Sequence, residues 1–257
     1  MQVAFSIIMF ILGAAIGSFL CCAVRRIHLR DEGTKLGSRS VCLHCRRRLR
    51  WYENIPILSW LFLRGRCKTC HRPIGTFEIF GEITTAVAFL IISTTIDLST
   101  AIAFDWFIFI ALFVLTSTLM FLALYDGMYG KLPTVALIVA AIAALLYAVF
   151  NVMEQHFVIG PTIASAATLG GLYLALYLIS KGKWVGDGDW ILAATIGLAL
   201  GRPFLALIAL FVSNFTASVI MWPSVHKTKN HKIYFGPFLV LAFLVTLLLS
   251  KYVIINV

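Results

Sequence analysis

The distribution of apolar residues constrains the fold of this chain more than any other feature. Eight nearly uninterrupted apolar runs follow one another, at roughly 3–24, 79–96, 102–125, 133–152, 161–180, 190–201, 203–222 and 234–255. A helix needs about 20 such residues to cross a bilayer. Hydrophobic residues make up 61% of the chain and charged residues only 12%, against roughly 25% charged in a typical soluble domain. We therefore predict an all-α membrane protein with about eight transmembrane helices.

Two of the runs need comment. The sixth is short, and Gly201-Arg202-Pro203 predicts a turn or break after it. Alternatively, this run is half of one long, broken element, which would change the topology of everything that follows. The first run has no Lys or Arg before Arg25, so we expect no cleaved secretory leader and expect the run to stay in the membrane.

The basic residues predict the orientation. If residue 1 lies outside, the loops 25–78, 126–132, 181–189 and 223–233 lie inside, and they hold 19 of the 21 Lys and Arg. Such an excess marks cytoplasmic loops and favours anionic lipid. Thirteen of these residues lie between Arg25 and Arg72. A basic segment can also bind nucleic acid, but the membrane interpretation is stronger, and we expect no nucleic-acid partner.

The predicted helices and loops divide the chain into three parts. Residues 1–24 form a first transmembrane helix, 25–78 form a small cytoplasmic insertion, and 79–257 form a seven-helix membrane body. Within the insertion, the segment 51–65 (WYENIPILSWLFLRG) is too apolar for a free loop. We expect it to pack on the membrane surface or against the helical body.

Four cysteines of the insertion form two pairs, Cys42-Leu-His-Cys45 and Cys67-Lys-Thr-Cys70, with 21 residues between them. Four thiolates in two tight turns suit the tetrahedral shell of zinc, and the spacing is one residue beyond the usual range. Two disulfides or four free thiols are the alternatives, but stable disulfides are rare in a reducing compartment. We predict a structural zinc site of Cys42, Cys45, Cys67 and Cys70, with His44 and His71 as possible substitutes for one ligand.

Two aspartates stand out among the eleven acidic residues. Asp126 ends the third apolar run, Asp189 begins the sixth, and the predicted topology places both at the cytoplasmic face. Acidic residues at such positions are costly and call for a reason. Two adjacent carboxylates share a proton, so that one can activate water as a base while the other acts as an acid. Taken singly, each could be only a helix cap or a solvated acid. Asp187 competes with Asp189, and we interpret it as a solvated loop acid.

At this point the motifs resemble a known family, the type IV prepilin peptidases among the GxGD aspartyl proteases. The resemblance rests on motifs in the family's order: Gly17-Ser18-Phe19-Leu20, the two cysteine pairs, WYENIPILSWLFLRGRC, Ala-Leu-Tyr-Asp126 followed by Leu132-Pro133, and Gly186-Asp187-Gly188-Asp189. They cover residues 13 to about 200. The sequence departs from the family's pattern at Cys21, where Asn is usual, and at Ile191, where Lys is common.

The resemblance implies a bifunctional enzyme of the bacterial plasma (inner) membrane with its active site toward the cytoplasm. Such an enzyme cuts the leader from prepilins or pseudopilins, which serve type IV pili or protein secretion. It then N-methylates the new N-terminus with S-adenosylmethionine. Asp126 and Asp189 match the family's catalytic pair, and the four cysteines match its zinc knuckles.

Three questions stay open at this level. Glu53 and Glu82 could attract the cationic cofactor or the substrate amine, or each could only neutralise a nearby Arg. The chain could instead be a non-proteolytic, zinc-bearing scaffold for a pilus or secretion system. It could also be a methyltransferase that has lost its protease. No glycine-rich Rossmann fingerprint is present, so we expect any cofactor site to be of another kind.

Overall fold

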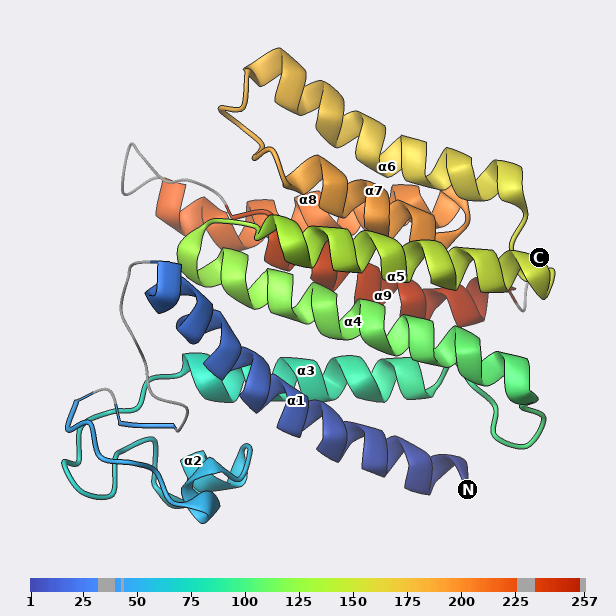
Figure 1. Cartoon of the computed structure of the whole chain (residues 1–257). Helices are drawn as coiled ribbons and strands as arrows, with labels where there is room; N and C mark the ends of the chain where they lie inside the picture. The colour runs from blue at the N-terminus through green and yellow to red at the C-terminus, as the bar shows by residue number, and fades with distance from the viewer. Residues whose placement is uncertain (32–39, 43, 226–233, 255–257) are drawn as a thin grey trace. The chain divides into compact units, whose positions relative to one another are not determined.

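In a computed structural model, every predicted apolar run is helical (Figure 1). The structure describes residues 1–31, 40–42, 44–225 and 234–254. The long helices are α1 (Gln2–Asp31), α3 (Phe77–Ser93), α4 (Ala103–Tyr129), α5 (Thr134–Met153), α6 (Ile159–Ser180), α7 (Asp189–Leu200), α8 (Pro203–Val225) and α9 (Gly236–Ile254). In the described residues there is no strand, only the isolated bridges Val41–Arg48 and Arg66–Pro73. The predicted fold class is confirmed.

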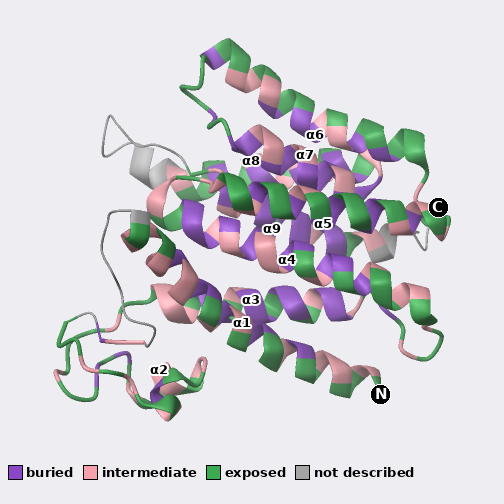
Figure 2. Cartoon of the chain, viewed as in Figure 1, coloured by how far each residue is buried: buried purple, intermediate pink, exposed green. Residues whose placement is uncertain are grey.

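The helices have the composition of membrane segments. Five of them, α1, α4, α5, α6 and α8, are long and apolar enough to cross a bilayer, and α7 and α9 contain shorter apolar helices. On α5, Val135, Ile138 and Ile142 are exposed, whereas Ala140 and Ala144 are fully buried (Figure 2). Large apolar side chains on the outside and small ones inside are expected when lipid is the solvent and backbones pack closely. The protein is therefore a multi-pass membrane protein.

The chain forms two compact units, Met1–Thr94 and Thr95–Val257. In the first unit, α1 and α3 lie side by side (Figure 1). Two glycines of α1 permit this contact. A Cβ atom added at Gly13 would lie 2.7 Å from Phe89 Cβ, and one added at Gly17 would lie 2.8 Å from the carbonyl oxygen of Gly81. Glycines four residues apart are a common way to bring membrane helices together.

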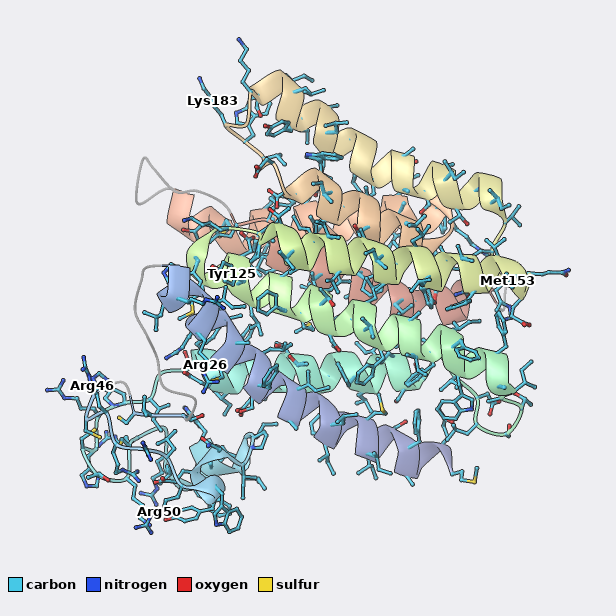
Figure 3. All side chains as sticks on the ribbon, viewed as in Figure 1. Arg26, Arg46, Arg50, Tyr125, Met153 and Lys183 are labelled. Carbon is cyan, nitrogen blue, oxygen red and sulfur yellow. The ribbon has the colours of Figure 1, made fainter. Side chains whose placement is uncertain are left out.

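The first unit also holds the insertion, which includes a short 3-10 turn (Trp51–Asn54) and helix α2 (Leu58–Phe62). Figure 3 shows Arg46 and Arg50 on the outside of this insertion. Several apolar side chains of the predicted apolar segment are exposed, with Trp51 79% and Phe62 83% accessible, whereas Ile57 and Trp60 are partly buried. Its packing on a membrane surface stays a prediction, as does the division into 1–24, 25–78 and 79–257.

In the second unit, helix α7 is surrounded. It packs against α5, α6, α8 and α9, and its side chains Leu192, Ala193 and Ile196 are fully buried. Gly201 follows α7 with φ 69°, a left-handed conformation that glycine adopts without steric cost. Helix α8 then begins at Pro203. The break predicted after the sixth run is confirmed, and α7 has only 12 residues.

Candidate functional site

Asp126 lies in the last turn of α4 and is 5% exposed. Its Oδ2 accepts a hydrogen bond of 2.9 Å from the backbone N–H of Gly236, 110 residues away in the sequence. Gly236 is the first residue of α9, so its N–H is one of those that a helix leaves without an internal partner. The carboxylate thus lies where the partial positive charge of a helix N-terminus favours an anion.

Asp189 has a similar environment at another helix. It is the first residue of α7, is 7% exposed, and its Oδ2 accepts a 2.9 Å hydrogen bond from the N–H of Gly186. Asp187, two residues earlier, is exposed. Asp189 is therefore buried and Asp187 exposed, and the roles assigned to them from the sequence stay predictions.

The structure brings the two aspartates together in one unit. Among the described residues, the carboxylate of each accepts a hydrogen bond through Oδ2 from a glycine N–H near the start of a helix. Buried carboxylates of this kind can act as acid or base toward a water molecule when they share it.

Glycines let the backbone approach these carboxylates. A Cβ added at Gly236 would lie 2.8 Å from Asp126 Oδ2, and one at Gly186 would lie 3.2 Å from Asp189 Oδ2. A Cβ at Gly188 would lie 2.9 Å from Leu132 Cβ, so the GxGD loop packs on the segment that follows Asp126. A side chain at either glycine of the GxGD motif would therefore crowd Asp189 or Leu132, which explains why glycine suits both positions.

Sequence reasoning did not single out Gly236 or the side chains that pack around it. Phe235, immediately before Gly236, packs against the ring of Tyr173 on α6, with ring centroids 5.4 Å apart. The Tyr173 hydroxyl lies 3.3 Å from Ser213 Oγ on α8. The sequence signal that could have found Gly236 is the Gly236-Pro237 start of the last apolar run, because proline is favoured in the first turn of a helix.

The four predicted zinc ligands come together in the first unit. The sulfur atoms of Cys42, Cys45, Cys67 and Cys70 all lie within 4.8 Å of one another. The two knuckles have the same backbone: Arg46 N–H donates to the carbonyl of Cys42, and His71 N–H donates to that of Cys67, at 2.9 and 3.0 Å. Arg46 and His71 both have φ 54°. Such a cluster can hold a metal such as zinc, and His44 and His71 are not part of it.

Backbone geometry favours a thiolate at Cys67. N–H groups of Cys70 and Thr69 directed at the sulfur lower the pKa of Cys67. The Sγ atoms of Cys42 and Cys70 lie 3.9 Å apart, well beyond the ~2.05 Å of a disulfide bond. A thiolate is the form that binds a metal, so the donor set fits zinc better than it fits two disulfides.

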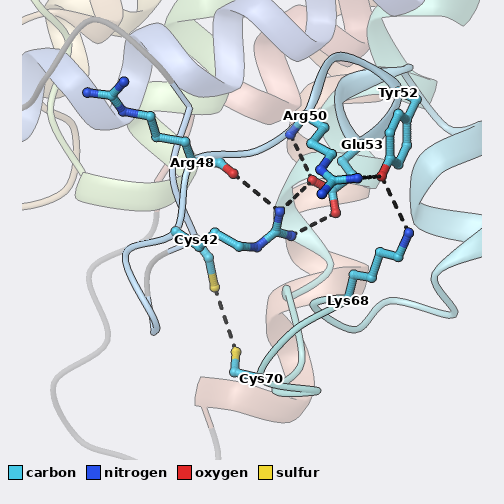
Figure 4. A network of polar contacts seen from close by, with 8 residues as sticks. Cys42, Arg48, Arg50, Tyr52, Glu53, Lys68 and Cys70 are labelled. Carbon is cyan, nitrogen blue, oxygen red and sulfur yellow. Dashed lines mark hydrogen bonds and ion pairs between the residues drawn. The ribbon is translucent and has the colours of Figure 1, made fainter.

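Glu53 is fully engaged by its neighbours (Figure 4). Its carboxylate accepts bonds of 2.7 and 3.0 Å from the Arg47 guanidinium and one of 2.7 Å from the N–H of Arg50. The Arg47 bonds hold the pKa of Glu53 below its usual value. Of the two hypotheses for Glu53, the structure favours neutralisation of a nearby Arg.

Glu82 connects two of the motifs singled out in the sequence. Its Oε2 accepts a 2.7 Å hydrogen bond from the N–H of Ile57, which has φ 63° in the WYENIPILSW segment. Its carboxylate is also hydrogen-bonded to the side chain of Ser18, from the Gly-Ser-Phe-Leu motif of α1. Glu82 therefore links the insertion to α1 and α3, and among the described residues it pairs with no Arg.

Comparisons with known proteins agree with these features. A sequence model described as the bacterial peptidase A24 N-terminal domain matches residues 11–96. Proteins named prepilin leader peptidase/N-methyltransferase are similar over most of the chain. The one from Aeromonas hydrophila is 30% identical over 94% of this chain and 89% of its own. The one from Dichelobacter nodosus is 32% identical, over 79% and 68%, and that from Dickeya chrysanthemi 30%, over 89% and 87%. No solved structure matches.

Proposed function

Because the chain belongs to the family of prepilin leader peptidase/N-methyltransferases, we propose that it is a membrane aspartic endopeptidase with a second, methyl-transferring activity. It cleaves the leader of type IV prepilins or pseudopilins at the cytoplasmic face of the bacterial plasma membrane. It then methylates the new N-terminus. The observation that supports the proposal is the pair Asp126 and Asp189: both are buried in one unit, and each carboxylate accepts a backbone N–H from a glycine.

Cleavage follows from the environment of the two carboxylates. One takes a proton from a water molecule as that water attacks the carbonyl carbon of the scissile bond, and the other donates a proton to the carbonyl oxygen. The C–N bond then breaks as the first carboxyl gives its proton to the leaving nitrogen and the second takes one back from the hydroxyl group. The N–H groups of Gly236 and Gly186 hold the Oδ2 atoms, and in this proposal the Oδ1 atoms face water and substrate. The cytoplasmic orientation is supported by the 19 basic residues in the loops on that side.

The two cofactors have separate roles. Cys42, Cys45, Cys67 and Cys70 would hold a structural zinc ion, which would connect the two knuckles of the insertion. S-adenosylmethionine would supply the methyl group that replaces a proton on the substrate's new N-terminal nitrogen. Nothing in this scheme requires the zinc ion to touch the substrate.

The proposal is tested on purified full-length protein with a prepilin and isotopically labelled S-adenosylmethionine. Mass spectrometry of the product N-terminus reports cleavage and methylation in one measurement. We expect a shortened, methylated product. Recovery of uncut prepilin would favour the alternative, a zinc-bearing scaffold. Methylation of a separately supplied mature pilin without any cleavage would indicate a methyltransferase that has lost its protease.

A glycine substitution probes the position of Asp126. Gly236→Ala places a Cβ 2.8 Å from Asp126 Oδ2, and we expect leader cleavage to fall by about 10²-fold, because displacements near 1 Å cost that much. Alanine favours helix more than glycine does, so the loss should occur without loss of fold. The measurement is the initial rate of leader removal.

Gly171→Ala is the matched control, because a Cβ at Gly171 on α6 has no atom within 4 Å. It should cleave at the wild-type rate. Equal rates for the Gly236 and Gly171 variants would show that the hydrogen bond between Gly236 and Asp126 does not position the catalytic carboxylate.

A further inference from the structure

The first unit contains a cavity of about 220 Å³ that the cleavage reaction does not use. It is lined by residues of α1, α3 and the insertion, including Ser18, Arg25, Arg47, Trp60, Glu78 and Glu82. Unlike the apolar interior of the helical body, its wall combines cationic and anionic side chains. The wall is therefore suited to a polar ligand that carries both charges.

Three buried polar atoms of this wall have no hydrogen-bond partner among the described residues. They are Arg25 Nε, Arg47 Nε and Glu78 Oε2, and the only two others in the described part of the chain are threonine hydroxyls of α4 and α9. Leaving such an atom unpaired is unfavourable, and more so when the group is charged. Residues that line this one cavity therefore hold three of the five unpartnered side-chain atoms in the described part of the chain, two on arginines and one on a carboxylate.

Glu78 is the carboxylate of this wall that has an oxygen without a hydrogen bond. Its Oε1 pairs with the Arg25 guanidinium, which also lies 5.5 Å from the ring centroid of Phe77, while its Oε2 is unpaired. Glu53 and Glu82 line the same cavity but are held by Arg47 and by Ile57. Neither of the carboxylates suggested by the sequence is therefore the best candidate for binding a cation.

Trp60 adds an aromatic surface. Its indole N–H donates 3.0 Å to the carbonyl of Gly75, and a Cβ added at Gly65, which has φ 66°, would lie 2.8 Å from its ring. Its hydrogen-bonding group is thus already used, and Gly65 approaches the ring closely. What Trp60 offers the cavity is its ring, which suits stacking on a planar heteroaromatic base.

We propose that this cavity is the binding site for S-adenosylmethionine, with Glu78 receiving its α-ammonium group and Arg25 its α-carboxylate. The cofactor has what the wall lacks: a carboxylate for the unpaired guanidinium N–H groups, a cationic amine for Glu78 Oε2, and a purine for Trp60. The assignment rests on the proposed methylation and names the residues that would serve it.

Binding is measured on the purified, zinc-loaded full-length protein by equilibrium dialysis with radiolabelled S-adenosylhomocysteine, the stable product of methyl transfer. Glu78→Gln keeps the side-chain shape but removes the charge, and we expect at least tenfold weaker binding, because two charge-assisted interactions are lost. Arg25→Gln should have a similar effect. In both variants the loss should be confined to binding and methylation, with leader cleavage and zinc content showing that the protein is folded.

Two further variants make the test decisive. Arg64→Gln removes an exposed charge of the insertion outside the cavity wall and should bind as the wild type does. The double exchange Arg25→Glu with Glu78→Arg keeps an ion pair but reverses the charges that face the ligand, so it should fold and not bind.

Wild-type affinity in Glu78→Gln and in the double exchange would overturn the site. If the wild-type protein neither binds the probe nor methylates, both the proposed methylation and the proposed binding site are wrong. Leader cleavage would distinguish that case from inactive protein.

Discussion

Replacing Asp126 by Asn, or Asp189 by Asn, should lower leader cleavage by about 10²–10⁴-fold, the usual contribution of a positioned acid or base. An amide can still accept the hydrogen bond from Gly236 or Gly186, so the backbone around each position should persist. It cannot take or share a proton, so the remaining carboxylate has no acid–base partner. The measurement is the initial rate of leader removal, with membrane insertion checked in the same preparation.

Asp187→Asn is the matched control for Asp189→Asn, since it lies in the same loop but is exposed. It should retain most of the activity. Substantial cleavage by either the Asp126 or the Asp189 variant would remove that residue from the catalytic pair. The double variant should be no slower than either single one, because the two carboxylates act as a unit.

The second large effect concerns zinc. The wild-type protein should contain one zinc ion per chain, and Cys67→Ser should reduce this to nearly zero. Binding of a structural zinc ion is worth about 10–16 kcal/mol in small peptides, and Cys67 is one of the two buried sulfurs of the cluster. Without the metal, two tight turns with few apolar contacts have little to hold them, so the insertion should become sensitive to proteases. Atomic absorption and limited proteolysis measure the two consequences.

Cys22→Ser separates loss of a thiol from loss of a ligand. Cys22 lies on α1, outside the four-cysteine cluster, so its variant should keep the metal and the resistance to protease. A zinc-free wild-type protein with an ordered insertion would show that the knuckles need no metal.

The extents of the helices were predictable from the sequence because apolar runs determine where a chain can cross a bilayer. All eight runs are helices, and even the short sixth run ends at Leu200, just before the predicted break. The pairing of Cys42 and Cys45 with Cys67 and Cys70 was predictable too, because the spacing of ligands in a knuckle is local. The orientation and the roles of the two aspartates stay predictions.

What the sequence could not show depends on contacts between distant residues. The hydrogen bond from Gly236 to Asp126 spans 110 positions, and no local pattern predicts which glycine will meet which carboxylate. The same holds for the glutamates. Glu53, Glu78 and Glu82 look alike in the sequence of a basic insertion and the helix after it. Only their partners show that, of these three in the described structure, Glu78 has a carboxylate oxygen without a hydrogen bond.

Helix α7 is too short to cross the hydrocarbon layer of a bilayer. Its 12 residues reach roughly 18 Å at about 1.5 Å per residue, whereas the hydrocarbon layer is about 30 Å thick. A two-residue turn joins the end of α7 at Leu200 to the 23-residue α8, and eight residues connect α6 to its other end at Asp189. Under the proposed function, the scissile bond must reach Asp189 at the end of a helix that is shorter than the hydrocarbon layer. A substrate segment that resists unwinding there should escape cleavage.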